Sequence, residues 1–327
     1  MQKTLNLLFL ILFFYSSYSQ ENNEFKPSGK IFVKIFTNYN SSLVEGKPVH
    51  NAFEVEKANF GYKYNLSKKI CGKIAFDVTD PGVGSLKNTT FLKHAYFEYK
   101  NKKLTAKFGM IGRYQFKIQE EMWGRRYLFK SFQHQYDFGD SADKGIFASY
   151  KFSKLISWDF AIENGEGEKT FESDSILKYG TGFVFSPAKW IETRGYYDFM
   201  GKTTSNAQQT FSSYIGFKFD KIKIGTEYNY QLNNKIQKKH NFGGYSIYTS
   251  YQLKKIAFFG RFDNLNSVKI DGEDETWNFA ENGQKIIAGI EYSPIKGFTI
   301  SPNYQSRYYQ NNNPTEHTLY ISCEIKF

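Results

Sequence analysis

The chain is short of cysteine and of long apolar segments. Its 327 residues include two cysteines, Cys71 and Cys323, which lie far apart in the sequence. So few cysteines exclude a disulfide framework of the kind that holds small exported proteins together, and we interpret both as small apolar fillers. After the first twenty residues, no stretch approaches the roughly 20 apolar residues that a transmembrane helix needs. A helical membrane protein and a disulfide-rich domain are therefore both excluded.

The first residues indicate export. Lys3 precedes an apolar run from Leu5 to Tyr15, and the small residues Ser17 and Ser19 follow. This order of a basic, an apolar and a small-residue region predicts a secretory signal peptide over residues 1–19. The alternative is an uncleaved anchor, but the run is too short to span a bilayer comfortably. Residues 20–327 then form the mature domain.

Acidic residues are fewer than basic ones. The chain has 43 Lys and Arg against 32 Asp and Glu, a formal net charge of +11. In an exported protein, such a balance indicates anionic solutes or anionic lipid headgroups as partners, and we expect no nucleic acid.

Residue patterns for catalysis and metal binding are also scarce. The five histidines show no ligand spacing for a metal, and His94, on a predicted strand, has no serine beside it on the same face. NGEGEKT at 164–170 lacks the leading glycine pattern of a phosphate-binding loop, and DGEDE at 271–275 lacks the spacing of a calcium loop. We predict no catalytic residue, no metal and no cofactor, and hence no enzyme.

Aromatic residues are abundant, yet the chain is polar on average. Phe, Trp and Tyr make up 19% of the sequence, whereas the mean hydropathy is −0.55. A transmembrane β-barrel combines these properties, because lipid-facing apolar residues alternate with polar residues that face the lumen. Apolar residues do alternate in sixteen segments, from Ile31, Val33 and Ile35 to the final ISCEIKF. A terminal Phe327 on such a strand resembles an outer-membrane insertion signal.

The connections between these segments alternate in length. Seven short ones, such as NLSKK and KNKK, each contain lysine, and longer loops rich in Asn, Ser, Gly and acids separate them. Short periplasmic turns and long outer loops are typical of outer-membrane barrels. A soluble β-sandwich is the alternative, but it does not explain this regular alternation. We predict an all-β fold, a transmembrane antiparallel β-barrel of about 16 strands.

The strand positions opposite the lipid face predict a charged lumen. They include the basic residues Lys34, Lys73, Lys107, Arg194, Arg261 and Arg307. Acidic residues such as Asp77, Glu98 and Asp159 share this face. A barrel of this size encloses more space than side chains fill, so a water-filled channel is expected.

One connection is much longer and more basic than the others. FGMIGRYQFKIQEEMWGRRYLFKSFQH ends one predicted strand and opens a loop from Ile111 to about Ser141. Folded into the lumen, this loop would bring its bases to a passing solute; they are Arg113, Lys117, Arg125, Arg126 and Lys130. The alternative is a structural plug, in which Glu120, Glu121, Asp137 and Asp140 neutralise the bases.

The stretch FGMIGRYQFKIQEEMWGRRYLFKSF, followed by SADKGI, resembles the phosphate-selective porin O and P family, especially porin-like outer-membrane proteins of Bacteroidetes. The resemblance implies a sixteen-stranded homotrimeric porin with a long inserted third loop as its constriction. Because acids interleave with bases on the wall, we predict general passage of small hydrophilic solutes. The bases of the long loop are the reason to expect an anion (phosphate-like) preference. The alternative function is a closed barrel that serves as an adhesin or as a scaffold of a surface or secretion complex.

Overall fold

The computed structural model describes residues 25–45, 47–80, 85, 88–310 and 313–327, and these form sixteen β-strands. The predicted signal peptide lies outside the described residues. The strands are β1 (Ser28–Val44), β2 (His50–Asn65), β3 (Ile70–Thr79), β4 (Thr89–Lys100), β5 (Leu104–Gly112), β6 (Ala142–Lys151), β7 (Ile156–Glu163), β8 (Lys178–Ala188), β9 (Ile191–Met200), β10 (Gln208–Lys218), β11 (Ile222–Leu232), β12 (Phe242–Leu253), β13 (Ile256–Ser267), β14 (Gly283–Ile295), β15 (Phe298–Tyr309) and β16 (Glu316–Lys326). Three short helices accompany them: α2 (Lys117–Trp123), α3 (Phe132–Gln135) and η1 (Asn234–Ile236).

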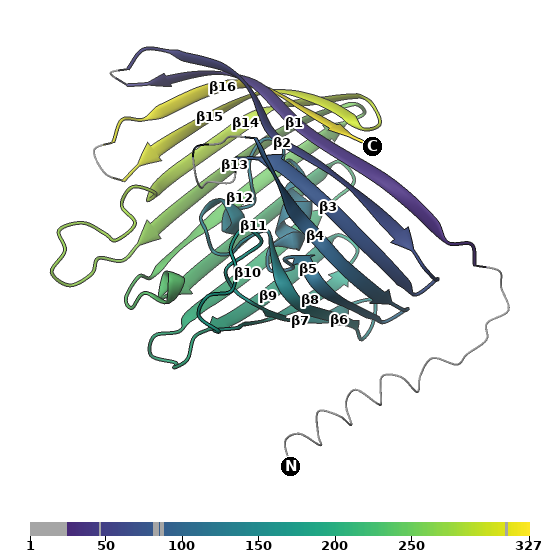
Figure 1. Ribbon diagram of the computed structural model, residues 1–327. Helices are drawn as coiled ribbons and strands as arrows, with labels where there is room; N and C mark the ends of the chain where they lie inside the picture. Colours follow the sequence, from purple (N-terminus) through teal and green to yellow (C-terminus); the bar gives the residue numbers. More distant parts are fainter. Residues whose placement is uncertain (1–24, 46, 81–84, 86–87, 311–312) are drawn as a thin grey trace.

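The sixteen strands close into one antiparallel barrel (Figure 1). Each strand pairs with its neighbours in sequence, and β1 pairs with β16 from Lys34↔Lys326 to Val44↔Glu316. Closure leaves no open sheet edge. The backbone N–H and C=O groups are therefore paired between strands, as they must be in lipid, which offers them no hydrogen-bond partner. The predicted fold class is confirmed.

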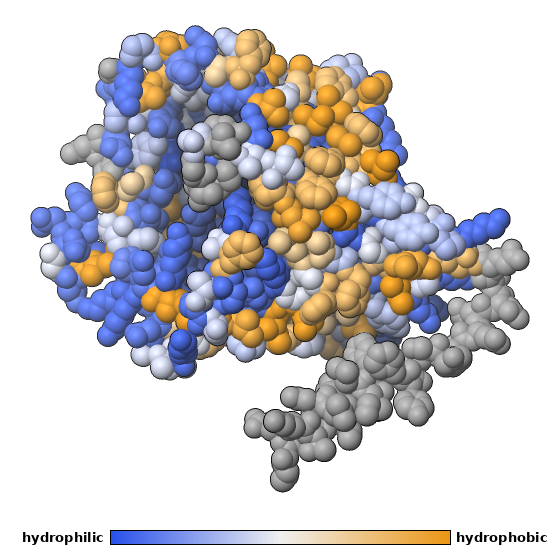
Figure 2. Space-filling view, in the orientation of Figure 1, coloured by the Kyte–Doolittle hydropathy of each residue, from blue (hydrophilic) through white to orange (hydrophobic). Residues whose placement is uncertain are grey.

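Side chains alternate between the two faces as the period-two pattern predicts. On β8, Lys178 is buried inside the barrel, whereas Tyr179, Phe183 and Phe185 are exposed on the outer wall. Apolar residues gather in the same way over the outer wall in Figure 2. No helix in the described part of the chain has the length and apolar character to cross a bilayer.

Short and long connections alternate around the barrel, so the two kinds lie at opposite ends (Figure 1). The short ones are 66–69, 101–103, 152–155, 189–190, 219–221, 254–255 and 296–297. Three of these are at least two residues shorter than the sequence predicts, because SPA of SPAK, QL of QLKK and SPI of SPIK continue β8, β12 and β14. Two of these strands end in register shifts, Phe185/Ala188 in the β8–β9 pair and Tyr292/Ile295 in the β14–β15 pair, which absorb the extra residues.

Two β-bulges on the first four strands change which residues face inward. In the β3–β4 pair, Ala75 lies opposite His94 while Phe76 lies opposite Leu92, so Lys93 is the extra residue. In the β1–β2 pair, Phe36 lies opposite Lys57 and Thr37 opposite Val55, so Glu56 is the extra residue. A bulge re-aims the side chains beside it.

Candidate functional site

The connection between β5 and β6, residues 113–141, lies inside the barrel, and we call it the inner segment (Figure 1). Its backbone carbonyls accept hydrogen bonds from the far wall: Tyr248 donates to Gln119 at 3.1 Å, and Arg261 donates to Lys130 at 2.8 Å. Gln133 donates to the hydroxyl of Ser212 at 3.0 Å. These contacts come from β12, β13 and β10, so the segment crosses the lumen.

Aromatic packing holds the inner segment against this wall. Trp123 is 1% exposed and meets Tyr248 and Phe259 edge-on, with ring centroids 5.7 and 6.0 Å apart. Phe132, also fully buried, packs with Phe138 and other apolar side chains in a second cluster. Burying each such side chain contributes about 1.5–3 kcal/mol. The segment is therefore a packed part of the barrel interior.

Two wall glycines make room for this packing. A Cβ atom on Gly216 would lie 2.2 Å from the Met122 Cε, and one on Gly244 would lie 2.8 Å from the Phe132 ring. Both distances are too short for non-bonded carbon atoms. The close approach of wall and segment thus depends on glycine at these positions.

Two of the five predicted solute-contacting bases form ion pairs with acids of the barrel wall. The Arg113 guanidinium is 2% exposed and contacts Asp143 at 2.8 Å and Glu163 at 3.3 Å. Burial alone lowers the pKa of Arg113, but Glu163, Asp140 and Asp143 outweigh it and raise this pKa. The Arg125 Nε lies 3.1 Å from Glu291, and its guanidinium stacks over Phe259. Sequence proximity suggested loop acids as partners, whereas Asp143, Glu163 and Glu291 lie on strands.

The other three bases of the inner segment are more accessible. Lys117 is 49% exposed and lies 3.7 Å from Glu121. Arg126 is 22% exposed, and its Nε lies 3.9 Å from Glu120. Burial is the main cause of a lowered pKa at Arg126 and also at Lys130, where the charge of Arg126 adds to it.

A cavity of about 440 Å³ lies between the inner segment and the wall formed by β1 to β5, and we call it the basic cavity. Arg113, Lys117 and Arg126 border it from the inner segment. Glu120 is the one acidic residue on its lining, against eight basic ones. The eight are Lys34, Lys57, Lys73, Lys93, Lys107, Arg113, Lys117 and Arg126.

Acids behind the lining pair with part of this charge. Lys57 contacts Asp77 at 2.7 Å and Lys107 contacts Glu98 at 3.2 Å. Lys93 contacts Glu168 from the 164–177 connection. Within the described residues, Lys34 and Lys73 make no ion pair; both ammonium groups lie over aromatic rings.

The remaining predicted wall residues lie away from the basic cavity. Arg194 is buried against Asp159, at 2.5 Å, and Arg261 against Asp263, at 2.7 Å. Arg307 contacts Glu281 at 2.5 Å. The wall thus carries both signs of charge. The bases of these three pairs lie on β9, β13 and β15, whereas the lysines that border the cavity lie on β1 to β5, where Asp77 and Glu98 pair with two of them.

Lys57 and Lys93 are the two bases on the cavity lining that the sequence did not indicate. Lys57 precedes the stretch of β2 where apolar alternation is clear, and Lys93 is the bulged residue of β4. The signal that points to them is a lysine beside a break in the period-two pattern. His94 also lines the cavity, next to Lys93.

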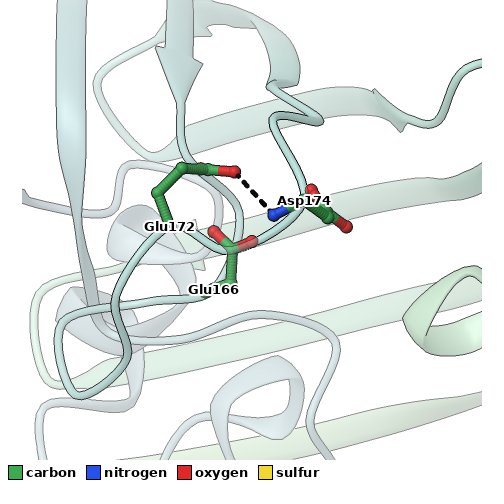
Figure 3. A group of neighbouring side chains, drawn as sticks. All are labelled: Glu166, Glu172 and Asp174. Atoms are coloured by element: carbon green, nitrogen blue, oxygen red, sulfur yellow. Dashed lines mark hydrogen bonds between the residues drawn. The ribbon is translucent and has the colours of Figure 1, made fainter.

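Three carboxylates of the 164–177 connection lie near one another: Glu166, Glu172 and Asp174 (Figure 3). Their nearest oxygens all lie within 4.8 Å. Glu172 accepts hydrogen bonds from the backbone N–H groups of Asp174 and Ser175, at 3.3 and 2.6 Å. Burial raises the pKa of Glu166, and the charges of Glu172 and Asp174 raise it further. We assign these three acids a structural role, since Glu172 accepts the backbone hydrogen bonds that fix the loop.

Both cysteines are free, as predicted. Cys71 is buried on the inner face, with its Sγ 3.6 Å from Glu98.

Comparison with protein families and with curated proteins finds no family model and no curated protein that matches this chain. Solved structures of outer-membrane proteins do match. OmpF of Salmonella typhi, in complex with daunomycin, has a TM-score of 0.68 at 11% identity, over 91% of this chain and 97% of that chain. The outer-membrane channel DcaP of Acinetobacter baumannii has a TM-score of 0.67 at 12% identity, over 95% and 100%. OprB of Pseudomonas putida has a TM-score of 0.64 at 10% identity, over 91% and 94%.

At these identities the likeness concerns the fold: the chain has the barrel fold of outer-membrane porins. The narrower resemblance to the phosphate-selective O and P family has no matching family model behind it and stays a prediction.

Proposed function

We propose that this protein is an outer-membrane porin, a passive diffusion channel for small hydrophilic solutes that favours anions. The observation that carries the proposal is the lining of the basic cavity, with eight basic residues and one acidic residue. The inner segment is hydrogen-bonded to β10, β12 and β13, and in this proposal solutes pass on its other side, between the segment and β1 to β5.

The mechanism is electrostatic. A hydrated passage removes the cost of carrying an ion through lipid, and the charges at its narrowest part decide which sign crosses faster. Lys34 and Lys73 contribute most, because no acid among the described residues is paired with them. Lys57 and Lys107 contribute less, because Asp77 and Glu98 offset their charge.

Export with removal of residues 1–19 and assembly as a homotrimer belong to the same proposal. Mass spectrometry of the protein from outer membranes tests the first, and chemical crosslinking in those membranes tests the second. An N-terminus at Met1, or crosslinked species no larger than a monomer, would contradict these parts.

Conductance of the purified protein in planar bilayers tests the main proposal. We expect steady open steps, and a reversal potential in a KCl gradient that shows chloride crossing faster than potassium. Repeated reconstitutions without current would favour the alternative function, a closed barrel that acts as an adhesin or scaffold. A reversal potential of the opposite sign would leave the pore but reject the anion preference.

A further inference from the structure

The basic cavity alternates lysines with aromatic rings along one band of its wall. The Lys73 ammonium lies 4.8 Å from the Phe32 ring centroid and 6.0 Å from that of Tyr96. Lys107 lies 4.8 Å from the Tyr96 centroid and 5.0 Å from that of Tyr114. Lys117 then lies 5.0 Å from the same Tyr114 ring. The band therefore runs from β1 across β3, β4 and β5 to the inner segment.

The rings in this band face the cavity. Phe32, Tyr96 and Tyr114 all border it and are only partly buried. Phe147 stacks on Tyr114, with ring planes 7° apart, and fixes the position of that ring. A solute in the cavity therefore meets ammonium groups and aromatic surface within a few ångströms of each other.

This combination favours some anions over others. An ammonium group attracts any small anion. The face of an aromatic ring carries negative charge, so it does not attract an inorganic anion. A solute that carries a ring beside its carboxylate can pair with the lysine and pack its ring against Phe32 or Tyr96. Such aromatic pairs stabilise binding beyond the area they bury.

The arginines give little support to recognition of inorganic phosphate here. Planar guanidinium groups suit phosphate because they bind its oxygens in pairs. Arg113 borders the cavity, but Asp143 and Glu163 already bind its guanidinium. Arg126 is the one other arginine on the lining. The remaining six bases are lysines, which act as point charges.

Resting on the proposed function, we infer that the basic cavity selects aromatic monocarboxylates, such as benzoate, over aliphatic and inorganic anions. The cavity volume of about 440 Å³ lies within the range of sites for small molecules. The lysines supply attraction for the carboxylate, and the rings between them supply selectivity for the flat apolar part.

Block of the chloride current in planar bilayers tests this inference. Benzoate, acetate and inorganic phosphate are added to the wild-type channel, and the half-blocking concentration of each is measured. We expect benzoate to block at a concentration at least about tenfold lower than acetate or phosphate. Phe32→Leu and Tyr96→Leu keep every charge. Each should reduce the ratio of the acetate to the benzoate half-blocking concentration severalfold, while the anion-to-cation permeability ratio stays unchanged.

Phe97→Leu is the matched control, since Phe97 is 54% exposed on the outer wall beside Tyr96. This variant should keep the wild-type ratio. Equal block by benzoate and acetate in an anion-selective channel would overturn the inference and leave the proposed function standing. An unchanged ratio in both ring variants would also overturn it. Absence of current in the wild type would reject the proposed function and the inference together.

Discussion

Replacing Lys73 by glutamine removes one positive charge from the basic cavity while keeping a polar side chain of similar length. Lys73 makes no ion pair in the described part of the chain, and its ammonium lies over the rings of Phe32 and Tyr96. The change therefore leaves no buried acid without a partner. We expect the barrel to fold normally and the anion preference to fall.

The size of the effect follows from Coulomb's law. Two unit charges about 5 Å apart in water interact with about 0.8 kcal/mol. At about 0.1 M salt the screening length is about 10 Å, and screening reduces this interaction energy to about 0.5 kcal/mol. The same lysine repels a cation as strongly as it attracts an anion. The free-energy difference between anion and cation passage should therefore fall by about 1 kcal/mol. The anion-to-cation permeability ratio should fall about fivefold as a result.

Reversal potentials across a KCl gradient measure this ratio. In about 1 M salt the screening length is about 3 Å, so the difference between variant and wild type should shrink to less than about twofold. Lys189→Gln is the control, because Lys189 is exposed in the 189–190 turn, away from the cavity lining. A Lys73→Gln channel with the wild-type ratio at low salt would refute the assignment of the passage to this cavity.

Three further predictions concern the inner segment. Arg126→Gln should lower the anion-to-cation ratio severalfold in the same assay, whereas Arg125→Gln should change it by less than about twofold, because Arg126 borders the basic cavity and Arg125 does not; equal effects would contradict this distinction. Arg113→Met should lower the free energy of unfolding by about 3–5 kcal/mol, because two buried acids lose their partner. Urea unfolding in lipid vesicles measures it, with exposed Lys117→Met as a control that stays within about 0.5 kcal/mol. The pKa of His134 lies well below its ordinary value, through burial and then the charges of Arg126 and Lys130. His134 therefore stays neutral from pH 8 to 6, and His134→Asn should show the wild-type pH dependence of the reversal potential; a flatter dependence would mean that the ring titrates.

The barrel itself was predictable because its signal is local. In β8, for example, Tyr179, Phe183 and Phe185 lie two or four residues apart and all face outward, since a strand reverses its side chains at every residue. Connection lengths are equally local, and the turns are where the lysine-containing stretches placed them, within two or three residues. The number of strands and the closed antiparallel order follow from these two patterns.

The inward orientation of Lys34, Lys73 and Lys107 was also predictable, because these residues lie on strands with regular alternation. Lys93 was not, since it is the extra residue of a bulge, and a bulge depends on how two strands pair. Lys57 lies beside a second bulge, between β1 and β2. The period-two pattern misplaces residues at such points.

The sequence by itself determined the fold class, the face on which most wall residues lie, and the basic character of the 113–141 connection. Only the tertiary structure decided which acids pair with these bases and which bases border the basic cavity. Arg113 and Arg125 pair with acids on β6, β7 and β14, and Glu291 is 166 residues away from Arg125 in the sequence. Lys34 and Lys73 make no ion pair among the described residues, and their ammonium groups lie over aromatic rings. The physical reason is that a charge is neutralised by what lies near it in space, and closing the barrel sets those neighbours.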